Sequence, residues 1–161
     1  MDLQPNLTRL QIPPGRQGTQ KTLEVMAQLA RQAAAIPKVQ EIARRLPNPE
    51  HVNAFLRMYW RIVDDPFYAE YIRAPLLQLE FWAAKGFLPG DCDDAATLAG
   101  ALVVATGWPA FFMAIRLPRM PEFSHVFLRV PIMFGFLDID PIVPAEHLPI
   151  TGYAEALEVW I

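Results

Sequence analysis

The spacing of apolar residues predicts helices in the first two thirds of the chain. Apolar side chains recur at three- and four-residue steps after Thr19 and Thr22, either of which can cap a helix that runs to about Ala35. A second, shorter helix is expected from Pro37 to about Leu46. Both helices are amphipathic, so another part of the chain has to cover their apolar faces.

Two further helices carry clear start signals. Asn48 is a good cap residue and Pro49 suits the first helical position, which predicts a helix that ends near Asp64. Pro75 opens the next helical stretch, which ends at Lys85 and is closed by a glycine.

A fifth helix is expected from Asp91, as the N-cap, to Ala105. It follows a Pro-Gly turn and is ended by Gly107. Cys92, the single cysteine of the chain, therefore lies at the N-terminus of a helix. Such a position favours the thiolate form of a cysteine.

Beyond this helix the apolar period changes to that of strands. Three short segments rich in Val, Ile and Phe are separated by proline-containing connections, and they cover residues 110–117, 123–130 and 134–140. They predict a small antiparallel sheet and hence an α+β fold. The tail is expected to end in a helical turn from Tyr153 to Trp160.

The N-terminal residues lack a core of their own. Residues 1–20 are rich in Pro, Gly, Gln and Asn and predict an extended arm. We therefore expect an arm over 1–20, a helical N-terminal segment over 21–46 and the main domain over 47–161. Residues 1–63 hold nine Lys or Arg against four acids, whereas the remainder holds five against thirteen. The two segments should attract each other or bind separate partners.

Composition excludes several classes of protein. Hydrophobic residues make up 53% of the 161 positions and charged residues 19%, which indicates a large core and excludes disorder as the main state. One cysteine forbids an internal disulfide and fits a reducing compartment such as the cytoplasm. No signal peptide is recognised, and the absence of a dense Lys/Arg run argues against nucleic-acid binding. The uncharged run from Ala95 to Ile115 is broken by Gly107 and Pro109, which argues against a membrane span.

The residue types needed for thiol catalysis follow in order along the chain. Cys92 opens its helix, His125 lies within a predicted strand, and Asp138 and Asp140 lie at the end of the next strand. If these strands are neighbours, His125 and one aspartate can face the cysteine as cross-strand partners. Strand alternation cannot choose between the two aspartates, because both have the same parity.

The carboxylates around the thiol work against its ionisation. Asp91, Asp93 and Asp94 would raise the pKa of Cys92 unless they point away from it. We expect Asp91 to cap its own helix, and Asp93 and Asp94 to face solvent or a structural arginine. The three acids do not follow the pattern of a calcium loop, so no metal site is expected.

These motifs together resemble the transglutaminase-like cysteine superfamily, which has a papain-like core. The resemblance rests on the order of Gly90-Asp91-Cys92-Asp93-Asp94, Gly107-Trp108-Pro109-Ala110, Ser124-His125-Val126 and Leu137-Asp138-Ile139-Asp140-Pro141, and it covers about residues 60–143. The stretch before the cysteine is similar to that of short bacterial and phage-encoded members. Two departures are Phe134-Gly135-Phe136-Leu137, where the strand often bears Trp, and Ile142, where Thr is common.

The resemblance implies roles for particular residues. Cys92 matches the nucleophile, His125 the general base, and Asp140, which directly precedes a proline, the third member of the triad. The backbone N–H of Cys92 would be one oxyanion donor. The second donor would be an upstream side chain, for which Tyr59, Trp60 and Gln78 are candidates. No cofactor is implied, and the chain lacks room for the extra domains of calcium-dependent transglutaminases.

Two functions remain open from the sequence. The first is a thiol amide hydrolase or acyl transferase that acts on a protein or peptide through a thioester. The second is an assembly module, such as a phage virion or tail component, that binds neighbouring subunits or further copies of itself through the N-terminal arm. An assembly module of this kind would be virion-associated, whereas the enzyme would be cytoplasmic.

Overall fold

A computed structural model describes residues 7–10, 13, 15–64 and 70–161 of the chain. Its α-helices are α1 (Arg16–Ala34), α2 (Pro37–Ala43), α3 (Pro49–Tyr59), α4 (Pro75–Lys85) and α5 (Cys92–Ala105). Its strands are β1 (Leu7–Leu10), β2 (Trp60–Ile62), β3 (Glu70–Arg73), β4 (Leu88–Gly90), β5 (Phe111–Arg116), β6 (His125–Ile132), β7 (Gly135–Ile139) and β8 (Glu155–Trp160). A short 3-10 helix, η1 (Ala145–His147), lies between β7 and β8.

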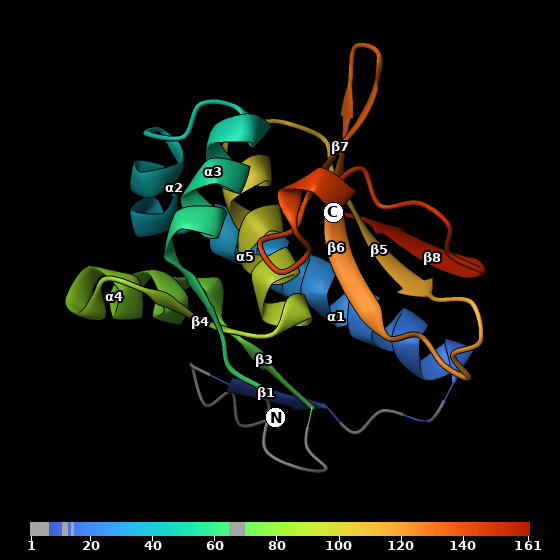
Figure 1. The fold of residues 1–161 in the computed structure, drawn as a ribbon. Coiled ribbons are helices and arrows are strands. Elements are labelled where there is room, and N and C mark those ends of the chain that lie inside the picture. The colour runs from blue at the N-terminus through green and yellow to red at the C-terminus, as the bar shows by residue number, and fades with distance from the viewer. Residues whose placement is uncertain (1–6, 11–12, 14, 65–69) are drawn as a thin grey trace.

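Helix α5 runs through the middle of the molecule, with a four-stranded sheet on one side and α2, α3 and α4 on the other (Figure 1). Small and apolar residues make this position possible, since the helix is buried from Asp93 to Val103. Gly100 lets other chain segments approach closely, because a Cβ there would lie 2.6 Å from the side chain of Ile161. Helix α1 packs along α5, so the amphipathic N-terminal helices find the cover that they need.

The sheet has the strand order β7-β6-β5-β8, and all its pairs are antiparallel. Val126, Leu128 and Val130 of β6 belong to the central core that contains α5. Phe127 faces a smaller apolar cluster together with Phe111 and Met113 of β5. The structure thus confirms the α+β class and the packing of the cysteine-bearing helix on a small antiparallel sheet.

The capping signals of three helices are confirmed. The Asn48 side chain accepts a hydrogen bond from the backbone N–H of His51 at 3.0 Å, which caps α3. Gly86 ends α4 in the left-handed region, with φ of 79°. Gly107 follows α5 with φ of 85°.

The predicted arm over 1–20 is wrong at its end. Helix α1 begins at Arg16, directly after Gly15, which has a positive φ of 78°. The hydroxyls of Thr19 and Thr22 bond to the carbonyls of Gly15 and Gly18 inside the helix instead of capping it. Before the helix, β1 pairs antiparallel with β3. The division of the rest into 21–46 and 47–161 stays a prediction, and both parts contribute to the central core.

The predicted helical turn from Tyr153 to Trp160 is wrong as well. Residues 155–160 form β8, which pairs with the whole of β5. Leu157 is buried, while Glu158 and Trp160 are exposed, so this stretch uses the two-residue period of a half-buried strand. Strand β6 extends through Pro131 to Ile132, where it lies beyond the residues that pair with β5 and pairs with β7, Pro131 being opposite Phe136.

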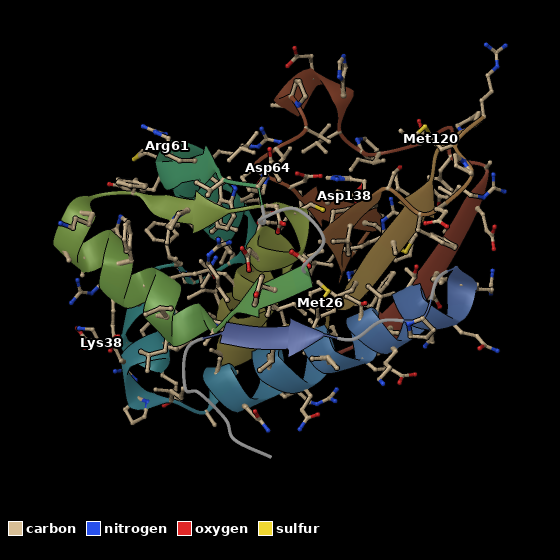
Figure 2. All side chains as sticks on the ribbon, turned by 90° about the horizontal axis from the view of Figure 1, so that it is seen from below. Met26, Lys38, Arg61, Asp64, Met120 and Asp138 are labelled. Atoms are coloured by element: carbon tan, nitrogen blue, oxygen red, sulfur yellow. The ribbon has the colours of Figure 1, made fainter. Side chains whose placement is uncertain are left out.

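The labelled side chains lie at different depths in the molecule. Figure 2 shows Asp138 inside the body of the molecule, whereas Lys38 and Met120 lie at its periphery. In the described ranges no helix combines the length and apolarity that a membrane crossing demands.

Candidate active site

Cys92 is the first residue of α5, and Asp91 alone separates it from the end of β4. Gly90 makes the tight connection possible, since it has φ of 155° and a Cβ there would lie 2.6 Å from the Asp94 side chain. Only glycine suits this position. Asp91 serves as N-cap, as expected, and its side chain accepts from the backbone N–H of Asp94 at 3.5 Å.

His125 is the first residue of β6 and meets Cys92 at one cavity. The cavity has a volume of about 380 Å³, and Cys92, Ser124 and His125 are among its lining residues. The backbone of Val126, the residue after the histidine, hydrogen-bonds to the Cys92 thiol. Strand β6 therefore brings His125 next to the cysteine.

Asp140 follows β7 and pairs with the histidine. Its Oδ2 contacts Nε2 of His125, while its Oδ1 accepts hydrogen bonds from the backbone N–H groups of Ile142 at 2.8 Å and Val143 at 3.1 Å. Both oxygens of this buried carboxylate are thus held. Asp140 therefore engages Nε2 of the imidazole ring rather than Nδ1.

Asp138 has a different set of contacts. Its two oxygens accept from Nε and Nη2 of Arg129 at 2.6 and 2.9 Å, and Oδ2 also accepts from the backbone N–H of Ile150 at 2.8 Å. Arg129 is the residue opposite Asp138 on β6. The structure therefore pairs Asp138 with an arginine and Asp140 with His125, a choice that strand parity alone left open.

Arg57 of α3 holds the segment that carries Asp140. Its Nη2 donates to the carbonyl oxygen of Asp140 at 2.6 Å and to that of Val143 at 2.8 Å. Arg57 is not among the residues that the sequence motifs pointed to. Nothing local marks it, since its acceptors lie more than 80 residues further along the chain.

The environment of Cys92 raises the pKa of its thiol from 9.0 to about 12. Burial is the main cause, followed by the negative charge of Asp93, with smaller contributions from Asp91 and Asp140. The hydrogen bond from the Val126 backbone acts in the opposite direction. Burial and the neighbouring carboxylates thus act against the thiolate that the helix N-terminus was expected to favour.

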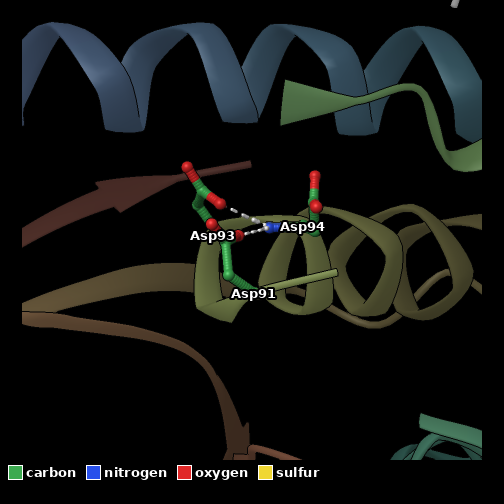
Figure 3. A group of neighbouring side chains, drawn as sticks. All are labelled: Asp91, Asp93 and Asp94. Carbon is green, nitrogen blue, oxygen red and sulfur yellow. Dashed lines mark hydrogen bonds between the residues drawn. The ribbon is translucent and has the colours of Figure 1, made fainter. Parts of the chain in front are cut away.

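The acids beside the cysteine point inward. Asp94 is fully buried and pairs with Arg73 of β3, so the expected structural arginine exists. Asp93 is buried rather than solvent-facing, and its Oδ1 accepts from the backbone N–H of Asp94 at 2.8 Å. Figure 3 shows the carboxylates of Asp91 and Asp93 both directed at this nitrogen.

The three acids also form the group of possible metal ligands found among the described residues. Their ligand oxygens lie within 4.8 Å of one another. Asp91 and Asp93 share the N–H of Asp94, and Asp94 pairs with Arg73, so interactions within the protein account for their positions. The cluster by itself carries no metal assignment.

The structure does not single out a second oxyanion donor among the three expected side chains. None of Tyr59, Trp60 and Gln78 lines the cavity that holds Cys92. Gln78 is buried and its Nε2 donates to the carbonyl oxygen of Pro89 at 3.3 Å. Tyr59 packs against the ring of Trp82, with centroids 5.4 Å apart.

The chain has a weak similarity to solved structures and no match among family models or curated sequences. Among solved structures, calcium-bound LapG of Legionella pneumophila is similar, with 21% identity and a TM-score of 0.44 over 86% of this chain and 75% of that one. EGTA-treated LapG of the same organism gives 21% identity and a TM-score of 0.45 over 86% of this chain and 73% of that one.

Proposed function

We propose that the chain is a thiol amide hydrolase or acyl transferase of the transglutaminase-like type, with Cys92 as nucleophile, His125 as general base and Asp140 as the group that orients the base. The observation that carries the proposal is the pairing of His125 Nε2 with Asp140 at the cavity that also holds Cys92. An imidazole whose far nitrogen is fixed by a carboxylate presents its near nitrogen to the nucleophile.

The reaction would proceed by acyl transfer through a thioester. As the Cys92 sulfur bonds to the carbonyl carbon of an amide, Nδ1 of His125 takes the thiol proton. The backbone N–H of Cys92 is a donor for the oxyanion that forms. The C–N bond then breaks, and the imidazolium gives its proton to the departing amine. Water or a second amine attacks the thioester, and the sulfur leaves as the thiol after proton transfer through His125.

The raised pKa of the thiol favours this concerted form of the reaction over a resting thiolate-imidazolium pair. At neutral pH a thiol with a pKa of about 12 is protonated, so the base must accept the proton during attack. His125 suits this role because an imidazole can both take and return a proton near pH 7. Asp140, with side-chain exposure of 2%, keeps the ring in place for both transfers.

Acylation by an activated ester tests the proposal directly. Purified protein is mixed with p-nitrophenyl acetate, and release of p-nitrophenolate is followed together with the intact mass of the protein. We expect one acetyl group on Cys92, lost in Cys92→Ala and formed at least about 100-fold more slowly in His125→Gln. His51→Gln is the matched control, because His51 is exposed on α3 and bonds to Asn48.

Thermal unfolding of each variant checks that the fold is retained. Absence of an acetyl-enzyme, or acetylation at the same rate in His125→Gln, would contradict the proposal. Alkylation of Cys92 by iodoacetamide with and without His125 gives a second, independent measure of whether the histidine acts on the thiol.

A further inference from the structure

We propose that an apolar groove that shares His125 with the Cys92 cavity is the leaving-group subsite, and that it selects substrates with a large apolar residue directly after the scissile bond. By the same geometry it would bind the acyl-accepting amine. This inference rests on the proposed function and specifies its substrate class.

The groove is a second cavity, of about 620 Å³, between the end of β5 and the segment around η1. Among the residues that the structure describes, His125 is the one that lines both this groove and the cavity that holds Cys92. The two cavities therefore meet at the proposed general base. The groove wall around η1 begins at Val143, whose backbone N–H donates to Oδ1 of Asp140, so the residue that contacts His125 also holds the start of this wall.

Reaction chemistry gives the groove its role. The imidazole that takes the thiol proton must return it to the leaving nitrogen, so that nitrogen lies against His125 when the C–N bond breaks. The acyl part of the substrate stays with the sulfur at the first cavity. The chain that continues from the leaving nitrogen therefore runs past His125, where the groove begins.

The lining indicates an apolar occupant. Its walls are the aliphatic side chains of Ile115, Leu117, Val143, Leu148 and Ile150. Ile115 and Ile150 are buried at its base, with 1% and 7% exposure. A volume of about 620 Å³ lies within the range of about 300–1,000 Å³ that is usual for small-ligand pockets, so a leucine or phenylalanine side chain has room to enter.

The polar groups of the groove lie at its edge. Glu146 and His147 of η1 are exposed. A carboxylate at the mouth repels an acidic residue and tolerates a neutral or basic one. The groove should accordingly accept leucine, methionine or phenylalanine and reject aspartate and glutamate.

Partitioning of the acetyl-enzyme tests this inference without a known substrate. After p-nitrophenyl acetate has acetylated Cys92, an added amine competes with water: its nitrogen bonds to the acetyl carbon, the C–S bond breaks, and the amine proton passes through His125 to the sulfur. Because the amine occupies the place of the leaving group, its preference reports on the groove. Leucinamide and glycinamide are compared at equal concentration, and the acetylated amides are quantified by mass spectrometry.

We expect acetyl-leucinamide to exceed acetyl-glycinamide by about tenfold or more, since burial of an isobutyl group favours the larger amine. Leu148→Trp and Thr151→Trp, which fill the groove at a half-buried and an exposed position, should remove most of the preference. Met133→Trp is the matched control, because Met133 is 87% exposed in the β6–β7 turn. Product formed with Cys92→Ala measures the uncatalysed background.

The outcomes separate the two proposals. Equal use of the two amines by the acetyl-enzyme, or a preference that survives both tryptophan variants, would overturn the groove assignment and leave the proposed function intact. Failure of Cys92 to become acetylated contradicts the proposed function, and the groove assignment falls with it. If one tryptophan variant fails to fold, the wild-type preference and the other variant still decide.

Discussion

The side chain of Arg57 binds the backbone of Asp140: its Nη2 donates to the Asp140 carbonyl oxygen at 2.6 Å. The same nitrogen donates to the carbonyl oxygen of Val143 at 2.8 Å. Oδ1 of Asp140 binds the backbone of the same short turn, at Ile142 and Val143. Through Arg57, helix α3 thus holds the turn from Asp140 to Val143, and the carboxylate of Asp140 contacts His125.

Replacement of Arg57 tests this connection. Arg57→Met should destabilise the fold by about 2–3 kcal/mol, because two hydrogen bonds from a charged donor are lost. Acetylation of Cys92 should slow by about 10- to 100-fold, since Asp140 is no longer held where it orients the base. Arg57→Lys should restore part of the rate. Arg61→Met is the control, because Arg61 is exposed and, within the described residues, its side chain donates to the carbonyl oxygen of its neighbour Trp60 and to no other group.

A stability loss alone would not establish a positioning role. The pH profile of acetylation should also change in Arg57→Met, since the environment of His125 is altered through Asp140. An unchanged rate and profile in a folded Arg57→Met protein would show that the turn keeps its geometry without the arginine.

The two aspartates of the β7 segment should separate activity from stability. Asp140→Ala is expected to slow acetylation by about 100-fold or more, because His125 loses the group that orients it. Asp138→Asn should leave that rate within a few-fold but cost about 3–5 kcal/mol, because it removes the charge opposite the nearly buried Arg129. Acetylation kinetics and urea unfolding on the same samples check both expectations. A reversed pattern would contradict the assignment of Asp140.

Local signals were enough to predict much of the site from the sequence. Pro89-Gly90 and Asp91 marked the start of α5 at Cys92, and the apolar run after it marked a buried helix. His125 was placed on a strand by its Val and Phe neighbours. Asp140 is preferred over Asp138 only through the family resemblance, which assigns the role to the aspartate directly before the proline, and the contact with His125 agrees with that preference.

The parts that the sequence did not predict depend on long-range contacts. Burial of Asp94 requires Arg73, which β3 brings to it from 21 residues away. Residues 155–160 contain no strong strand signal, and they become β8 because β5 offers an edge to pair with. The raised pKa of Cys92 follows from burial and from the inward direction of Asp93, and neither can be read from the local sequence.

The N-terminal arm gives a prediction about assembly. The pairing of β1 with β3 covers the edge of β3 within one chain. Deletion of residues 1–10 should therefore lower the melting temperature while the mass measured by light scattering stays the same or rises, because an uncovered strand edge promotes association. The interpretation of the arm as a clasp between subunits predicts the opposite, a smaller assembly after deletion.

Asp94 should make stability fall as pH rises through its titration. Burial is the main cause that raises its pKa from 3.8 to about 6, although Arg73 acts in the opposite direction. Between about pH 4 and pH 6 the folded state therefore binds more protons than the unfolded state, so this group contributes stability at pH 4 that is lost by pH 6. The difference between wild type and Asp94→Asn in the free energy of unfolding should change by about 3 kcal/mol across that window. Asp64→Asn, at an exposed position, is the control, and a wild-type stability that rises relative to Asp94→Asn would contradict the assignment.

Cys92 and Asp93 make the sharpest electrostatic prediction. With a pKa of about 12, the thiol should react with iodoacetamide slowly at pH 7, and the logarithm of the rate should rise by about one per pH unit up to at least pH 10. Asp93→Asn removes the largest charge contribution, so it should lower the pKa and speed alkylation at pH 8 by about tenfold. Asp64→Asn should leave the rate unchanged, and a chelator in all samples keeps divalent cations from screening the carboxylates. A wild-type rate that levels off near pH 7 would mean that Cys92 is already a thiolate at rest, and then His125 would act as an imidazolium partner rather than as the base that takes the proton during attack.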